Sequence, residues 1–176
     1  MSVRGRVLAP SDRLRYSPGS LVLIVCADPA TRERFCARVL EDPSALLSMD
    51  KVRGLLQGRV GDAEIETKAL ALIDTAVTKR LAGGQTVVMA MEDLDRGRRE
   101  RYVRMAAEHR RPRHLILVEA GKESVADEDR AALSELRTAL DAGGLGAEGF
   151  MTSLRLGGRT VEELKRIVFA RPPADD

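Results

Sequence analysis

The chain has 176 residues, of which 44% are hydrophobic and 32% are charged, and its net charge at pH 7 is +2. These values predict one soluble globular domain and exclude a membrane protein, since no apolar run approaches the roughly 18 residues that a span requires. The small net charge and an aromatic content of 3% give no indication of nucleic-acid binding. Two cysteines and two histidines are too few for a disulfide framework or a zinc site. We therefore expect a cytoplasmic protein without a metal centre.

The first half of the chain begins with a basic, turn-rich segment, residues 1–20, which we interpret as a partly ordered arm in which residues 7–8 could pair as an edge strand. Residues 21–26 (LVLIVC) form a continuous apolar run, which predicts a central parallel strand covered on both faces. Asp28 and Pro29 then predict an N-cap and the first position of a helix that ends near residue 40.

The remaining elements alternate in the same manner. We expect strands over residues 45–47, 86–91, 114–118 and 150–156, and helices from Ser48 or Asp50 to 57, from Asp62 to 82, over 95–110 and 127–142, and from Thr160 to 168. This order predicts a doubly wound α/β fold, a five-stranded parallel sheet flanked by helices, in one domain over residues 21–170 with a tail at 171–176. Ligands of such sheets bind at the carboxyl ends of the strands.

One segment after the second predicted strand carries a resemblance to a known family. Residues 48–55 (SMDKVRGL) resemble the S-x-D-x-x-R-G-L segment of bacterial polynucleotide 5′-kinases and the related small ATP-dependent kinases of the P-loop kinase superfamily. Residues 82–88 (AGGQTVV) and 148–150 (EGF) are also similar to this family. The resemblance implies a P-loop kinase-like fold, with Asp50 as the general base on the attacking hydroxyl and Arg53 in contact with a substrate phosphate.

The phosphate loop of that family is degenerate in this chain. Where the family has G-x-x-x-x-G-K-[ST], Cys26 and Thr31 replace the glycines, Arg32 replaces the lysine, and Glu33 replaces the hydroxyl residue that binds Mg²⁺. The glycines allow backbone N–H groups to surround the phosphates, and other residues resist those conformations. The carboxylate of Asp28 would also occupy the free N–H groups and the positive dipole end that a phosphate requires. We expect this helix to cap itself and to close the phosphate site.

Two further parts of the family's catalytic machinery are absent from the sequence. The third predicted strand ends in MAME where the family has D-A-T-N, and residues 119–129 (EAGKESVADED) are acidic where the family's lid carries arginines. Phosphoryl transfer depends almost wholly on positioning and charge neutralisation. The combined losses predict that catalysis of this reaction is reduced by many orders of magnitude.

Three hypotheses of function follow. The first is a non-catalytic, pseudokinase-like regulator that binds a protein partner or a nucleotide-type or phosphorylated ligand at the strand-end cleft, through Arg32, Asp50, Arg53, Arg96, Arg98 and Arg99. The second is a kinase that phosphorylates the 5′-hydroxyl of a polynucleotide or another small hydroxyl substrate, with ATP and Mg²⁺ as cofactors, an atypical phosphate loop and Asp50 as base. The third is a structural domain that forms homo-oligomers. A plain structural interpretation also stays open, in which Asp50 and Arg53 form a surface ion pair and the arginines after residue 95 form a solvated face.

Overall fold

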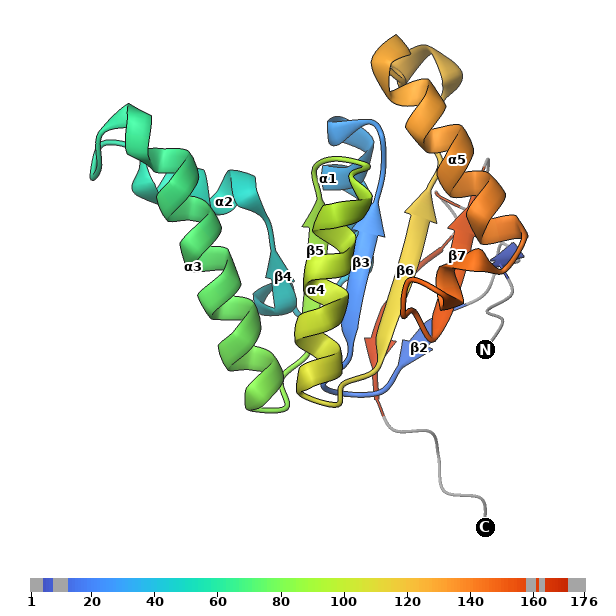
Figure 1. Ribbon diagram of the computed structural model, residues 1–176, viewed down its shortest axis with the longest axis horizontal. Helices are drawn as coiled ribbons and strands as arrows, with labels where there is room; N and C mark the ends of the chain where they lie inside the picture. The colour runs from blue at the N-terminus through green and yellow to red at the C-terminus, as the bar shows by residue number, and fades with distance from the viewer. Residues whose placement is uncertain (1–4, 8–12, 158–160, 162–163, 171–176) are drawn as a thin grey trace.

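The computed structural model describes residues 5–7, 13–157, 161 and 164–170 of the chain. Its centre is a six-stranded sheet in the order β1-β7-β6-β3-β5-β4, in which every neighbouring pair is parallel (Figure 1). The strands are β1 (Gly5–Val7), β3 (Leu21–Val25), β4 (Leu46–Leu47), β5 (Val87–Met91), β6 (Arg113–Val118) and β7 (Thr152–Leu156). Two further strands, β2 (Leu14–Tyr16) and β8 (Ile167–Phe169), pair with each other in a separate parallel sheet.

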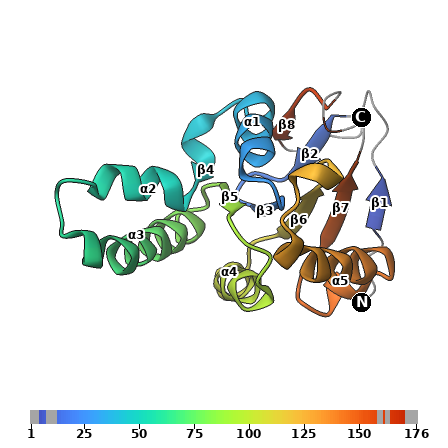
Figure 2. The same cartoon turned by 90° about the horizontal axis from the view of Figure 1, so that it is seen from above.

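Helices cover both faces of the sheet (Figure 2). They are α1 (Pro29–Val39), α2 (Met49–Leu56), α3 (Asp62–Ala82), α4 (Arg96–Glu108) and α5 (Arg130–Asp141), with 3₁₀ turns η1 (Pro43–Ala45), η2 (Lys122–Ser124), η3 (Asp127–Asp129) and η4 (Gly144–Gly146). This architecture confirms the predicted doubly wound α/β class, with β1 as an additional edge strand.

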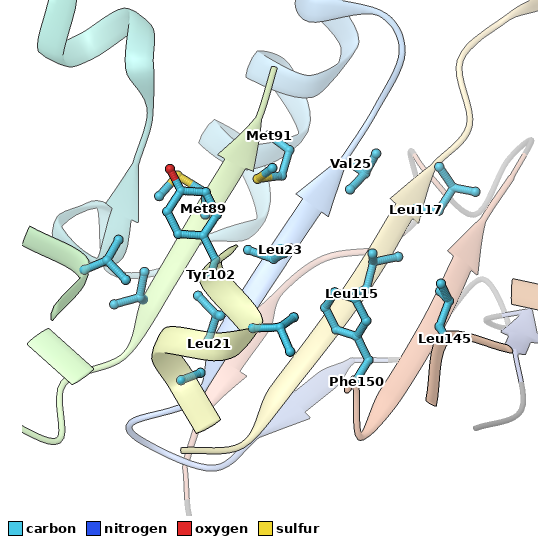
Figure 3. Close-up of a cluster of buried hydrophobic side chains, with 14 of the residues drawn as sticks. Leu21, Leu23, Val25, Met89, Met91, Tyr102, Leu115, Leu117, Leu145 and Phe150 are labelled. Carbon is cyan, nitrogen blue, oxygen red and sulfur yellow. The ribbon is translucent and has the colours of Figure 1, made fainter. Parts of the chain in front are cut away.

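The central strand β3 explains why its sequence is apolar without interruption. Successive side chains of a strand point to opposite faces. Leu21, Leu23 and Val25 pack into a core formed with α3, α4 and α5 (Figure 3). Val22 and Ile24 pack into a second core, formed with α1 and the β2–β8 pair. Both faces of β3 are therefore buried, and each face of the strand belongs to a different core.

The C-terminal helix predicted from Thr160 to 168 is wrong in its second half, although Val161 is helical. Thr160 lies outside the described residues, whereas Ile167 and Val168 belong to β8. The apolar residues Val161, Leu164, Ile167 and Val168 have helical spacing, but the Ile-Val-Phe run has β-branched and aromatic side chains that favour a strand. The segment forms a strand because it pairs with β2. The strand β2, which lies in the N-terminal arm, was not predicted from the sequence.

Smaller differences concern the ends of helices. Gly61, not Asp62, is the N-cap of α3, and Asp62 lies in the first helical turn. Ser48 rather than Asp50 caps α2, because the Ser48 hydroxyl accepts a hydrogen bond of 3.2 Å from the backbone N–H of Lys51. The helix predicted over residues 127–142 is divided into the turn η3 and α5. No helix within the described residues is long and apolar enough to cross a membrane.

The chain changes direction at the centre of the sheet. The connection from β3 through α1 passes over β5 to β4, whereas the connection from β5 through α4 passes β3 on the other face to reach β6. The two connections diverge at the carboxyl ends of β3 and β5, where doubly wound sheets place their ligands. The candidate site is therefore expected between α1, α2 and the end of β5.

Candidate functional site

The junction between β3 and α1 contains three residues, Cys26, Ala27 and Asp28. Asp28 is the N-cap of α1: its Oδ2 accepts hydrogen bonds from the backbone N–H of Thr31, at 3.2 Å, and from the Thr31 hydroxyl, at 2.5 Å. Pro29 occupies the first helical position. The bonds from Thr31 hold the pKa of the Asp28 carboxyl below its usual value. These contacts confirm the predicted cap.

The same junction leaves no loop of the phosphate-binding kind. Thr31, Arg32 and Glu33, which align with the end of the family's loop, all lie inside α1. The backbone N–H of Thr31 is bonded to the Asp28 side chain, and that of Arg32 to the Asp28 carbonyl at 3.0 Å. A phosphate at a helix N-terminus depends on such N–H groups being available. The first turn of α1 therefore has little left to offer an anion.

Arg32 has an unusual environment for an arginine. Only 6% of its surface is exposed to solvent, and its Nη1 donates a hydrogen bond of 3.2 Å to the carbonyl of Cys26. Among the described residues it makes no ion pair and no other hydrogen bond. Its position on α1 follows the apolar stripe, because Arg32 precedes the buried Phe35, Cys36 and Val39 by three, four and seven residues. That spacing was a sequence signal for its burial, and sequence reasoning missed it.

Arg53 has the opposite environment. Its Nε and Nη2 donate to Glu66 at 2.9 and 2.7 Å, its Nη1 and Nη2 donate to Glu92 at 2.8 Å each, and its Nη1 donates to Asp50 at 3.0 Å. These bonds account for all five N–H groups of a guanidinium. They raise the pKa of Arg53 and lower the pKa values of Glu66 and Glu92. A phosphate could bind Arg53 only by displacing a carboxylate.

The other arginines predicted to bind a ligand are also paired. Arg96 bonds Glu100 one turn along α4, at 2.9 Å. Arg98 lies 3.5 Å from Glu92 and 3.8 Å from Asp93. Arg99 forms a buried ion pair with Glu148 at 3.2 Å, and its Nη1 also donates to the Leu94 carbonyl. The structure thus brings Asp50, Arg53 and Arg98 together around Glu92, and places Arg32, Arg96 and Arg99 in separate environments.

A cavity of about 600 Å³ opens between α1 and the start of α2, beside the ends of β4 and β5. Arg32, Glu33 and Asp50 are among the residues that line it. Most of the remaining lining is apolar and was not predicted; it includes Cys36, Leu40, Leu46 and Met49, with Lys51 and Glu92 as further charged members. A largely apolar cavity with a few polar groups is the usual form of a small-molecule site.

The segment after β6 does not supply the arginines of a kinase lid. Glu119 accepts hydrogen bonds from Arg137, and Arg155 lies 3.0 Å from it. Both arginines are thus paired with a carboxylate of this segment, where a kinase lid would present arginines to a phosphate. Arg130 pairs with Asp127 at 3.2 Å. In the part of the chain that the structure describes, no three His, Cys, Asp or Glu side chains come together as a metal site.

Comparison with known proteins adds little to this geometry. No protein-family model and no curated protein matches the chain. Among solved structures, the chain is similar to a putative kinase from Chloroflexus aurantiacus J-10-fl, at 18% identity and a TM-score of 0.44, with 83% of this chain and 88% of that chain covered. Similarity at this level is too weak to carry an argument about function. The α/β architecture rests on the strand order of the chain itself.

Proposed function

We propose that the chain is a non-catalytic, P-loop-kinase-like binding domain with a regulatory role, and that its ligand or partner enters at the carboxyl edge of the sheet. The observation that carries this proposal is the three-residue junction between β3 and α1, closed by Asp28. A nucleotide triphosphate needs backbone N–H groups and a cation at this point. Here one N–H is bonded to a carboxylate, and that carboxylate would repel a phosphate.

The surroundings of Asp50 also disfavour the alternative, an ATP-dependent kinase. Its side chain is 75% exposed and is paired with Arg53 at 3.0 Å. The Arg53 guanidinium, which would contact the substrate phosphate by the family resemblance, is already bonded to three carboxylates. Transition-state stabilisation in phosphoryl transfer requires cations that are free to contact the transferring group. Arg53, the cation beside the predicted base Asp50, is therefore not free to contact a transferring phosphoryl group.

The test of this proposal is a search for turnover. Mg-ATP and Mg-GTP are titrated by calorimetry, and transfer of the γ-phosphate to a 5′-hydroxyl oligonucleotide is followed with radiolabelled ATP. We expect no transfer by the natural chain and none by Asp28→Gly, because removing the cap carboxylate does not lengthen the junction. Asp42→Gly, which removes the comparable cap of η1, is the matched control for stability. Saturable ATP binding with phosphate transfer that is lost in Asp50→Asn would overturn the proposal.

A second candidate function, an oligomerisation domain, is favoured by one observation on the α2–α3 hairpin. This hairpin projects from the side of the sheet (Figure 2), and it carries Leu55 and Leu72, which are 66% and 49% exposed. Scattered exposed leucines are common on monomers. Sedimentation equilibrium decides the matter: a dimer that dissociates in Leu55→Ser/Leu72→Ser supports this candidate, and a concentration-independent monomer excludes it.

A further inference from the structure

We propose that the cavity beside α1 binds a small monocarboxylate with an apolar body, and that Arg32 holds the carboxylate. This inference rests on the proposed function, because it places the ligand in the same strand-end cleft. It begins from the observation that Arg32 is a buried cation for which the described residues provide no carboxylate.

The donors of Arg32 are distributed in a way that suits a carboxylate. Nη1 is bonded to the Cys26 carbonyl, which fixes the plane of the guanidinium. Nε and Nη2 have no acceptor among the described residues, and neither is one of the fully buried polar atoms that lack a partner, so both keep contact with solvent. Because Arg32 lines the cavity, these two nitrogens form the side-on fork that binds the two oxygens of a carboxylate in parallel.

The other charged groups that line the cavity do not pair with Arg32. Glu92 and Asp50 are bonded to Arg53, and Glu33 is exposed on the surface of α1. Lys51 adds a second cation at the rim. Burial raises the pKa of the Cys36 thiol to about 11, and the charges of Arg32 and Lys51 oppose that rise. Two cations therefore act on the same wall of the cavity.

The lining favours a monocarboxylate over a phosphate ester. One buried guanidinium with a single free fork can neutralise one charge, whereas a phosphate dianion needs further donors. Glu33, Asp50 and Glu92, which also line the cavity, disfavour a second negative charge there. Leu40, Leu46 and Met49 offer an apolar wall to a hydrocarbon or aromatic body. The volume of about 600 Å³ lies in the usual range for small-molecule sites.

The test compares charged and neutral probes of the same shape. Octanoate and 4-phenylbutyrate are titrated by calorimetry against octanamide, 4-phenylbutyramide and phenyl phosphate. We expect each acid to bind about tenfold or more tightly than its amide, and Arg32→Gln to remove this preference. Arg32→Lys, which keeps the charge without the fork, should retain part of it. Arg34→Gln, an exposed arginine on α1 that does not line this cavity, is the matched control and should bind as the natural chain does.

A stability measurement separates a ligand-binding arginine from a structural one. If Arg32 is kept for a ligand, Arg32→Met should leave the melting temperature of the unliganded protein unchanged or higher, since a buried cation without a counter-ion is unfavourable. A marked loss of stability would overturn the inference, as would equal binding of acid and amide, tighter binding of phenyl phosphate, or no binding of either acid. If any of these results is obtained and the protein also shows no ATP turnover, the proposed non-catalytic function is unaffected. Only the proposal that the ligand is a monocarboxylate is then excluded.

Discussion

Arg32 and Arg53 lie at the same edge of the sheet and have inverted environments. Arg32 is buried and has one carbonyl partner, whereas Arg53 is partly exposed and is bonded to three carboxylates. Ordinarily the more buried of two charges is the better paired, because desolvation makes an unpaired charge costly. The inversion indicates that Arg53 serves the fold, by joining α2, α3 and the end of β5, and that Arg32 is the charge with capacity left for a ligand.

The largest effect is expected where pairing and burial coincide, at Arg99. Both side chains of the Arg99–Glu148 pair are almost fully buried. Arg99→Met leaves the Glu148 carboxylate buried without its counter-ion, which should cost about 3–5 kcal/mol of unfolding free energy. Urea unfolding monitored by circular dichroism measures this. The double variant Arg99→Met/Glu148→Met should recover most of the loss, and a single variant with the stability of the natural chain would contradict the assignment.

The next effect concerns Arg53 and has a defined pH dependence. Arg53 lowers the pKa of Glu92 and of Glu66, so their pKa values are lower in the folded than in the unfolded chain. The unfolded chain then binds more protons, and stability from these groups is present above their ordinary pKa and lost as pH falls through the folded values. Arg53→Gln should lower the melting temperature at pH 7 by about 4 °C and flatten its decline below about pH 5.

Thermal unfolding between pH 3 and 7 tests this. Arg96→Gln is a suitable control, since it breaks an exposed pair within α4 and should change stability by less than about 0.5 kcal/mol. If Arg53→Gln kept the natural acid dependence, the pairing of Arg53 with Glu66 and Glu92 would not be the source of its stability.

A smaller effect is expected at Asp28, whose carboxylate closes the site beside Arg32. Asp28→Ala removes both bonds from Thr31 and should cost about 1 kcal/mol of unfolding free energy. Asp28→Asn keeps an acceptor oxygen at the cap and should cost clearly less. Urea unfolding of the two variants compares them directly. Equal losses would mean that the charge of Asp28, and not its cap geometry, stabilises the start of α1.

The sequence allowed the fold and the cap to be predicted because both depend on local residues. The run at β3 is apolar without interruption because two cores meet on that strand, and Asp28-Pro29 carries the chemistry of a helix start in adjacent positions. β8 was mistaken for a helix because its apolar residues fit helical spacing, and the partner strand β2 that decides its conformation lies about 150 positions earlier in the chain.

The candidate site could be predicted only in part. Comparison with the family's segment gave Arg53 the main binding role, but Glu66 and Glu92, which occupy its donors, are 13 and 39 positions away. Nothing in the local sequence shows that such distant carboxylates meet one guanidinium. The burial of Arg32 was visible in its spacing from Phe35, Cys36 and Val39, yet the lack of a counter-ion required the folded chain.

The smallest effect should come from Lys51, which shares the cavity with Arg32 but is exposed at its rim. An exposed cation is screened by water and salt, so Lys51→Gln should weaken octanoate binding by only about two- to threefold at low ionic strength. The difference should vanish near 0.5 M salt, where the screening length falls to about 4 Å, whereas the effect of Arg32→Gln should persist because Arg32 is buried. Calorimetry at two salt concentrations, with Lys68→Gln on α3 as control, separates the two. A salt-independent loss in Lys51→Gln would mean that Lys51 contacts the carboxylate itself. The carboxylate would then be bound by Lys51 as well as by Arg32, which contradicts its assignment to Arg32 alone.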